Sequence, residues 1–401
     1  MPLKSSIKNL KLRRIVSGVM VVAAAIAAVS LVRATQSPAG LPAPAALAAT
    51  CQNKSSNDLL ECWNSLLGRA SLQYGLTATF NLVDFLYRND PLFAGSCHSY
   101  AHLIGQKSYE LWAQGKSLDA TPSVSSCGYG FYHGFMEALV GRGGQISQAR
   151  DFCLKIDQQL SKFGSKDASS CFHGIGHGTA TPHDTSLYGK PQAMIGPALS
   201  LCQTAATEAK QREDCHTGVY SAIATFMGDR EYGLDVDTSD PLGLCPKQDP
   251  QYQAPCYIGM VVALSSLTQN SLPLAAPYIE KIQDDSIAKL VIRAMTGPVI
   301  YSDPKRQDFT EQILDCRRLQ PRLRESCLLG FAAGIYEFHS AKDGLGAVFN
   351  FCSTQAMTER EHESCFGQMV RTVKDAHQPD EIRSACRQLP TEDQKYCEAA
   401  T

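Results

Sequence analysis

Histidine is concentrated in one part of this 401-residue chain. Six of the ten histidines lie between residues 98 and 183. Five of the six, with one glutamate, form three pairs spaced four residues apart: His98/His102, His133/Glu137 and His173/His177. Residues four apart on an α-helix share one face, a turn apart. Because two such side chains converge on a single ion in metal-binding helices, the three pairs predict a metal site.

The composition of these pairs limits the chemistry of the predicted site. Five imidazoles and one carboxylate suffice for two ions, or for one ion with three ligands and an open position. Nitrogen-rich ligation favours zinc, copper or iron over magnesium or calcium. Glu137 is the candidate catalytic residue, as a ligand or as a general base. His183 and Asp184 follow the third pair and are expected either to line the site or to lie on the surface. The remaining histidines are expected to be structural (His216) or on the surface (His339, His362 and His377).

Three functions fit such a site. The first is a metal-dependent enzyme, either an oxygen-handling iron or copper enzyme or a zinc hydrolase. The high histidine count and the lack of accompanying aspartates favour oxidative chemistry. The second is a metal-binding protein without catalysis, and the third is an interaction scaffold that binds a peptide or glycan. The chain has no Gly-x-Ser-x-Gly elbow, no phosphate-binding glycine loop and no His-Glu-x-x-His motif.

The elements that carry the histidines are predicted from a repeated signature. A cysteine, two variable residues and a glycine precede an apolar stretch with helical spacing. Ala294–Gly297 is a copy without its cysteine, and from Cys127 onward the copies are spaced 32 to 44 residues apart. This period is that of a helix–turn–helix unit and predicts an all-α solenoid or toroid of helical hairpins. The clear copies are Cys127–Gly130, Cys171–Gly174, Cys215–Gly218, Cys256–Gly259 and Cys327–Gly330, and looser ones begin at Cys62, Cys97, Cys365 and Cys397.

Sixteen cysteines in a chain with an export signal indicate an oxidising compartment. Most neighbours in the sequence are separated by 11 to 18 positions, which two residues flanking a helix–helix turn can bridge. Eight sequential disulfides are therefore expected: Cys51–Cys62, Cys97–Cys127, Cys153–Cys171, Cys202–Cys215, Cys245–Cys256, Cys316–Cys327, Cys352–Cys365 and Cys386–Cys397.

The arrangement of cysteines and glycines resembles that of disulfide-stapled, cysteine-rich helical repeat proteins of the tetratricopeptide-like type, which place one cysteine on each helix of a hairpin. The resemblance covers residues 51–400 and implies architecture only. The glycine of each signature is expected to allow a neighbouring helix to approach closely. The glycines beside the histidines are expected to leave room for an ion, water or substrate: Gly134, Gly174, Gly176 and Gly178.

The N-terminus carries an export signal. Five basic residues precede an apolar run at 15–32, and Arg33 closes it. Residues 1–34 are thus a cleaved signal peptide or a signal anchor, 35–50 an Ala/Pro-rich linker, and 51–401 the repeat domain, with the metal site in 97–184. The predicted location is extracytoplasmic, periplasmic or secreted, with membrane contact only through the N-terminal segment. A net charge of −2 argues against nucleic acid, and the expected partner is a small-molecule or peptide substrate.

Overall fold

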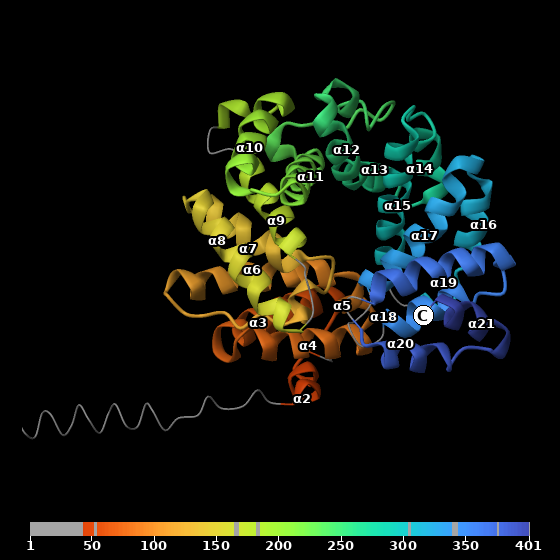
Figure 1. The fold of residues 1–401 in the computed structure, drawn as a ribbon. Helices are drawn as coiled ribbons and strands as arrows, with labels where there is room; N and C mark the ends of the chain where they lie inside the picture. Colours follow the sequence, from red (N-terminus) through yellow and green to blue (C-terminus); the bar gives the residue numbers. More distant parts are fainter. Residues whose placement is uncertain are drawn as a thin grey trace, which may run out of the picture. The chain divides into compact units, whose positions relative to one another are not determined.

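A computed structural model describes residues 43–51, 54–163, 168–181, 185–303, 306–338, 344–374 and 377–400. Within these ranges every regular element is a helix (Figure 1), so the predicted all-α class is confirmed. The expected signal segment lies outside the described residues. Of the expected linker, the described part is not irregular, because Pro44–Ala49 forms the short helix α2. Among the described helices, none combines the length and the apolar character needed to cross a membrane.

The helices fall into two sets that alternate along most of the chain. The signature helices carry or directly follow a copy of the repeated signature: α3 (Ser56–Tyr74), α6 (Cys97–Ala113), α7 (Gly130–Gly141), α9 (Ala168–Ala180), α11 (Ala209–Phe226), α12 (Pro250–Gly259), α15 (Asp285–Ser302), α17 (Pro321–Phe338), α19 (Glu359–Val373) and α21 (Thr391–Ala400). The connecting helices lie between them: α4 (Leu76–Asn89), α5 (Pro91–Gly95), α8 (Ile146–Leu160), α10 (Pro191–Ala205), α13 (Val261–Leu267), α14 (Leu272–Ile279), α16 (Thr310–Arg318), α18 (Gly344–Cys352) and α20 (Pro379–Cys386).

Consecutive signature helices make the most extensive contacts in the molecule: α9 with α11, α6 with α7, α15 with α17, and α7 with α9. Their glycines make these contacts close. A Cβ atom at Gly218 of α11 would lie 2.0 Å from the His173 carbonyl oxygen, and one at Gly176 of α9 would lie 2.0 Å from the Cys215 carbonyl oxygen. Since no side chain fits between the two backbones, the expected role of the signature glycine in helix approach is confirmed.

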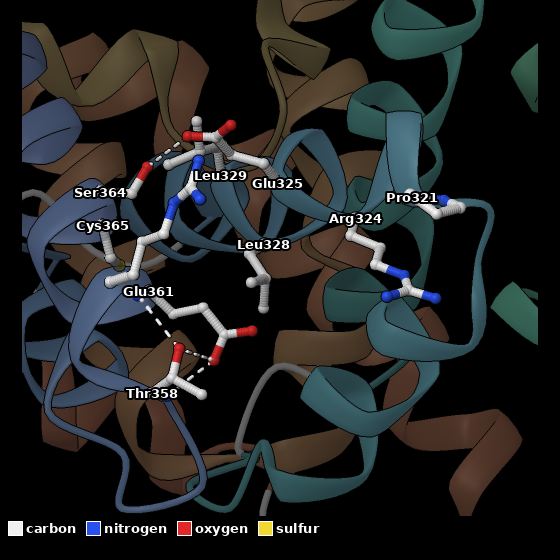
Figure 2. Close-up of a pocket in the computed structure, with 10 residues that line it drawn as sticks. Pro321, Arg324, Glu325, Leu328, Leu329, Thr358, Glu361, Ser364 and Cys365 are labelled. Carbon is white, nitrogen blue, oxygen red and sulfur yellow. Dashed lines mark hydrogen bonds between the residues drawn. The ribbon is translucent and has the colours of Figure 1, made fainter.

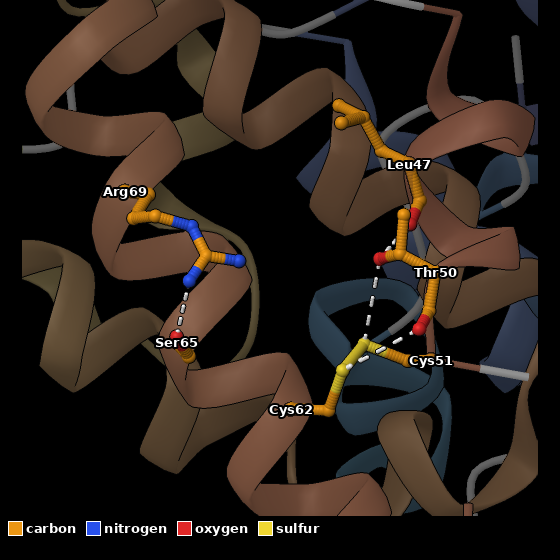
Figure 3. The surroundings of a disulfide bond; sticks show 6 residues. All are labelled: Leu47, Thr50, Cys51, Cys62, Ser65 and Arg69. Carbon is orange, nitrogen blue, oxygen red and sulfur yellow. Dashed lines mark hydrogen bonds between the residues drawn. A yellow bond between two sulfur atoms is a disulfide. The ribbon is translucent and has the colours of Figure 1, made fainter.

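All eight sequential cysteine pairs are disulfide-bonded in the structure. Most join the end of one helix, or the turn after it, to the following signature helix. The first is shown in Figure 3, where Cys51 follows α2 and pairs with Cys62 of α3. Beside it, the Thr50 hydroxyl donates to the Leu47 carbonyl oxygen and closes the last turn of α2. Disulfides in this number are those of a protein in an oxidising, extracytoplasmic environment.

The Cys97–Cys127 disulfide departs from the hairpin pattern. It joins the first residue of α6 to the turn before α7, two signature helices that follow one another in the array. This bond therefore fixes the starts of the two helices that carry the first two histidine pairs.

Candidate metal centre

Three histidines from two neighbouring helices converge in the structure. His133 comes from α7, and His173 and His177 come from α9. Each offers a ring nitrogen, and the three nitrogens lie within 4.8 Å of one another. The rings of His133 and His177 are 4.2 Å apart between centroids, and those of His133 and His173 are 5.1 Å apart. This set of three imidazoles is compact enough to bind one metal ion.

Two ring nitrogens of this cluster are buried and lack hydrogen-bond partners among the described residues. They are Nε2 of His133 and Nε2 of His177. Buried polar atoms are almost always paired, because an unpaired one loses its hydration without compensation. Two such atoms in adjacent rings are what a metal-binding site has when its ion is removed. The residues therefore fit a metal ion on this ground, independently of the sequence pattern.

Glu137 lies beside the converging nitrogens and not among them. One carboxylate oxygen is 3.3 Å from Nε2 of His102, and the other is 3.6 Å from Nδ1 of His177. A carboxylate can only accept hydrogen bonds, so it favours a proton on Nδ1 of His177 and leaves the lone pair on Nε2. Nε2 of His177 is the atom without a partner among the described residues. Glu137 therefore favours the tautomer and the ring orientation in which His177 can bind a metal ion through Nε2.

His98 is oriented by the turn that precedes α7. Its Nδ1 donates to the Cys127 carbonyl oxygen over 3.0 Å, and its ring lies 5.1 Å from that of His133. Cys127 and Tyr129 have φ of 60° and 64°, a left-handed conformation that non-glycine residues rarely adopt. Such backbone strain occurs where the surrounding structure enforces it, commonly at functional sites. The turn is held by the disulfide from Cys97, the residue next to His98.

The glycines beside the histidines have a different role from the one expected. A Cβ atom at Gly134 would lie 1.9 Å from the His102 carbonyl oxygen, and one at Gly174 would lie 2.7 Å from the Tyr132 carbonyl oxygen. At Gly178 the Met136 carbonyl oxygen is equally close, at 2.7 Å. The space at these glycines is filled by neighbouring backbone and is not available to an ion or substrate. They bring α6, α7 and α9 close enough for histidines on different helices to meet.

Burial sets the protonation of the cluster. It is the main reason that the pKa of His98 falls to about 4, with the nearby His102 adding to the effect. The pKa values of His133 and His173 lie well below the ordinary value because of burial and then the neighbouring His177. Burial alone would raise the pKa of Glu137, but hydrogen bonds from His102 and His177 outweigh it and lower the pKa to about 2. At neutral pH His98, His133 and His173 are therefore neutral and Glu137 is ionised, as metal binding requires.

Sequence reasoning did not identify Tyr301, which reaches the cluster from α15. Its hydroxyl accepts a hydrogen bond from the His98 backbone N–H over 3.1 Å, and its ring lies edge-on to the His98 ring at 6.4 Å between centroids. The two residues are 203 positions apart. No local pattern marks a contact of this separation, because the fold alone brings α15 to α6.

The structure thus brings together all six residues of the three predicted pairs, with His133, His173 and His177 as the converging set and His98, His102 and Glu137 around it. His183 and Asp184 lie outside the described residues, as does His339. His216 is buried and its Nε2 is 3.3 Å from the Gln203 side-chain nitrogen, in accord with a structural role. His362 and His377, which were expected on the surface, are half-buried, with side chains 12% and 18% exposed.

Comparison of the chain with models of protein families, with curated proteins and with solved structures finds no match.

Proposed function

We propose that the protein is an extracytoplasmic metalloprotein in which His133, His173 and His177 bind one transition-metal ion. The observation that carries this proposal is the pair of buried, unpartnered Nε2 atoms on His133 and His177. Neutral imidazole nitrogens favour zinc, copper or iron. The six-residue constellation supplies three ligands and a surrounding shell, so one ion accounts for every member.

We further propose that the site is catalytic and that the protein is a metal-dependent enzyme. Three protein ligands leave at least one coordination position open, which is typical of catalytic and not of structural sites. A bound ion would supply Lewis acidity or redox chemistry there. The chain's own residues orient the ligands: Glu137 contacts His102 and His177, and the Cys127 carbonyl group holds His98. The high histidine count, without the aspartates common in hydrolytic two-metal sites, is the ground for proposing oxidative chemistry over hydrolysis.

Metal binding without catalysis is the second candidate, and the burial of the cluster favours it. His133 is 7% exposed, and the side chain of His177 is 11% exposed. On the open side of the cluster lie His102 and Glu137, with side chains 25% and 33% exposed. A substrate would have to approach from that side, whereas a stored ion would need no such access.

The proposed scaffold for either function is a solenoid or toroid of stapled hairpins. Two observations support it: each signature helix packs on the next one along the chain, and Tyr301 of α15 contacts His98 of α6. At the positions where earlier copies of the repeat carry histidines, later copies carry apolar residues, such as Val262 of α13 and Ala333 of α17. The scaffold therefore does not depend on metal for its shape.

The experiment is elemental analysis of full-length protein exported into an oxidising compartment. About one equivalent of zinc, copper or iron per chain is expected. Replacing the bound ion by cobalt(II) then separates the enzyme from the metal-binding protein without catalysis. Added azide changes the visible spectrum of cobalt(II) only if it can occupy an open coordination position, so a change is expected for the enzyme. A protein that retains no transition metal after purification and takes up none on reconstitution would refute the proposal.

A further inference from the structure

A cavity of about 350 Å³ lies among α12, α15 and α17. Three lining residues occupy the positions that hold histidines in earlier copies of the repeat. Ile258 and Thr296 stand two places after the first residue of the signature, as His173 does, and Ala333 stands six places after it, as His177 does. The cavity is therefore on the face of the later signature helices that corresponds to the metal-binding face of α7 and α9.

The α15 wall of this cavity ends about one turn before Tyr301, the residue of α15 that contacts the metal cluster. Leu290, Ala294 and Gly297 line it, and they are followed by Tyr301 at the next step of the same helical stripe. Tyr301 contacts His98, whose ring is 5.1 Å from that of His133. Since a helix rises about 1.5 Å per residue, the eight residues from Arg293 to Tyr301 span about 12 Å.

Arg293 is the cation at the mouth of the cavity. It is exposed, and no described residue forms a hydrogen bond or ion pair with its guanidinium group. The α15 wall is otherwise apolar except for Thr296, whose hydroxyl donates to the Arg293 carbonyl oxygen, and the α17 wall adds the carboxylate of Glu337. The cavity between α17 and α19, of about 330 Å³ (Figure 2), holds two carboxylates that accept hydrogen bonds, Glu325 from Ser364 and Glu361 from Thr358, and it is lined by Arg324 and Arg360 as well.

We propose that the cavity among α12, α15 and α17 binds an elongated apolar carboxylate, with its carboxylate on Arg293 and its chain directed along α15 toward Tyr301. This inference rests on the proposed function in one respect, because it makes the bound molecule the substrate of the metal centre. The length of α15 between Arg293 and Tyr301 matches that of a medium-length alkyl chain, and the guanidinium group is the natural partner of a carboxylate.

Decanoate is the probe, titrated by calorimetry into the metal-loaded full-length protein and into the metal-free protein. Arg293→Gln is expected to weaken decanoate binding about five-fold, the effect of an exposed charge pair. Lys289→Gln, an exposed residue one turn earlier on α15, is the matched control and should leave the affinity unchanged. Ala333→Phe, which fills the cavity, should abolish binding. Circular dichroism checks that this variant keeps its helices, and Arg293→Gln alters only an exposed side chain.

The orientation of bound decanoate is measured by the relaxation of its protons in protein loaded with copper(II), compared with protein loaded with zinc(II). Copper(II) is paramagnetic and speeds the relaxation of nearby protons, whereas zinc(II) does not. The methyl protons should relax faster than the protons next to the carboxylate. Equal binding of decylammonium, or equal effects of Arg293→Gln and Lys289→Gln, would overturn the site. Binding without differential relaxation would overturn the route to the metal. If the protein binds no metal at all, elemental analysis reports that separately, and the calorimetry of metal-free protein still decides whether the cavity binds carboxylates.

Discussion

The imidazole rings of His133 and His177 are stacked at 4.2 Å between centroids, with their planes inclined by only 12°, although they come from different helices. Two imidazolium ions in this position would repel each other in a medium with little screening. Two neutral imidazoles avoid the repulsion but leave both Nε2 atoms without a partner among the residues that the structure describes. The proposed metal ion would resolve both problems, because it would take the two lone pairs and leave each ring neutral.

The first prediction follows from this stacking. His177→Ala and His133→Ala should each remove bound metal, since each takes away one of three ligands, while the helical content stays unchanged. His377→Ala, a change on a partly exposed histidine outside the cluster, should keep its metal. Elemental analysis and circular dichroism of the three variants check this. Full metal retention in both cluster variants would assign these histidines a purely structural role.

Glu137 gives a prediction that separates an orienting residue from a ligand. Glu137→Gln keeps the size of the side chain but removes the charge that holds His177, and loss of such an outer contact typically lowers metal affinity about 10- to 100-fold. The affinity is measured by competition with a chelator. Glu110→Gln on α6, which removes the partner of Lys107, is the control and should have no effect. Complete metal loss, as severe as in His177→Ala, would show instead that Glu137 is itself a ligand.

Gly134 allows α7 to lie directly against α6. A Cβ atom there would overlap the His102 carbonyl oxygen, which is backbone and cannot turn away. Gly134→Ala should therefore force the helices apart, destabilise the protein by about 1–3 kcal/mol and weaken metal binding. Gly141→Ala, at the end of the same helix with no atom near the new methyl group, should not destabilise it. Urea unfolding of both variants measures the difference, and equal midpoints would contradict the tight contact.

The pairing of Arg317 with Glu361 predicts a pH dependence that is independent of the metal site. Burial would raise the pKa of Glu361, but hydrogen bonds from Arg317 and Thr358 outweigh it and lower the pKa. A carboxylate with a depressed pKa stabilises the fold above its unfolded pKa, and the contribution is lost as the pH falls through the folded value. Glu361→Gln should thus cost about 1 kcal/mol at pH 7 and much less at pH 3. Unfolding at both pH values tests this, with the exposed Glu363→Gln as the control.

The sequence predicts those features that depend on local spacing. The pairs four residues apart and the cysteines flanking a turn are fixed within one or two helices, so the three histidine pairs and all eight disulfides could be anticipated. The roles of Glu137, Gly134 and Tyr301 depend on how separate helices meet. Packing determines the orientation of the Glu137 carboxylate, the space beside Gly134 and the contact of Tyr301 with a residue 203 positions away. Packing between distant helices cannot be inferred from a single sequence.

The last prediction contrasts two disulfides with different positions. Closing a loop of 11 residues, as Cys316–Cys327 does, stabilises the fold by about 2–3 kcal/mol through the unfolded chain. Replacing both of these cysteines by serine should therefore lower stability but leave the metal content unchanged, because α17 carries no ligand.

The bond between Cys97 and Cys127 closes 30 residues and holds the turn whose carbonyl group accepts from His98. Its removal should lower stability by about 3–4 kcal/mol and also weaken metal binding, because the strained turn is then free to relax away from His98. Chelator competition on the two double variants measures the contrast. Equal metal affinities in the two double variants would show that the histidine cluster does not depend on the Cys97–Cys127 disulfide.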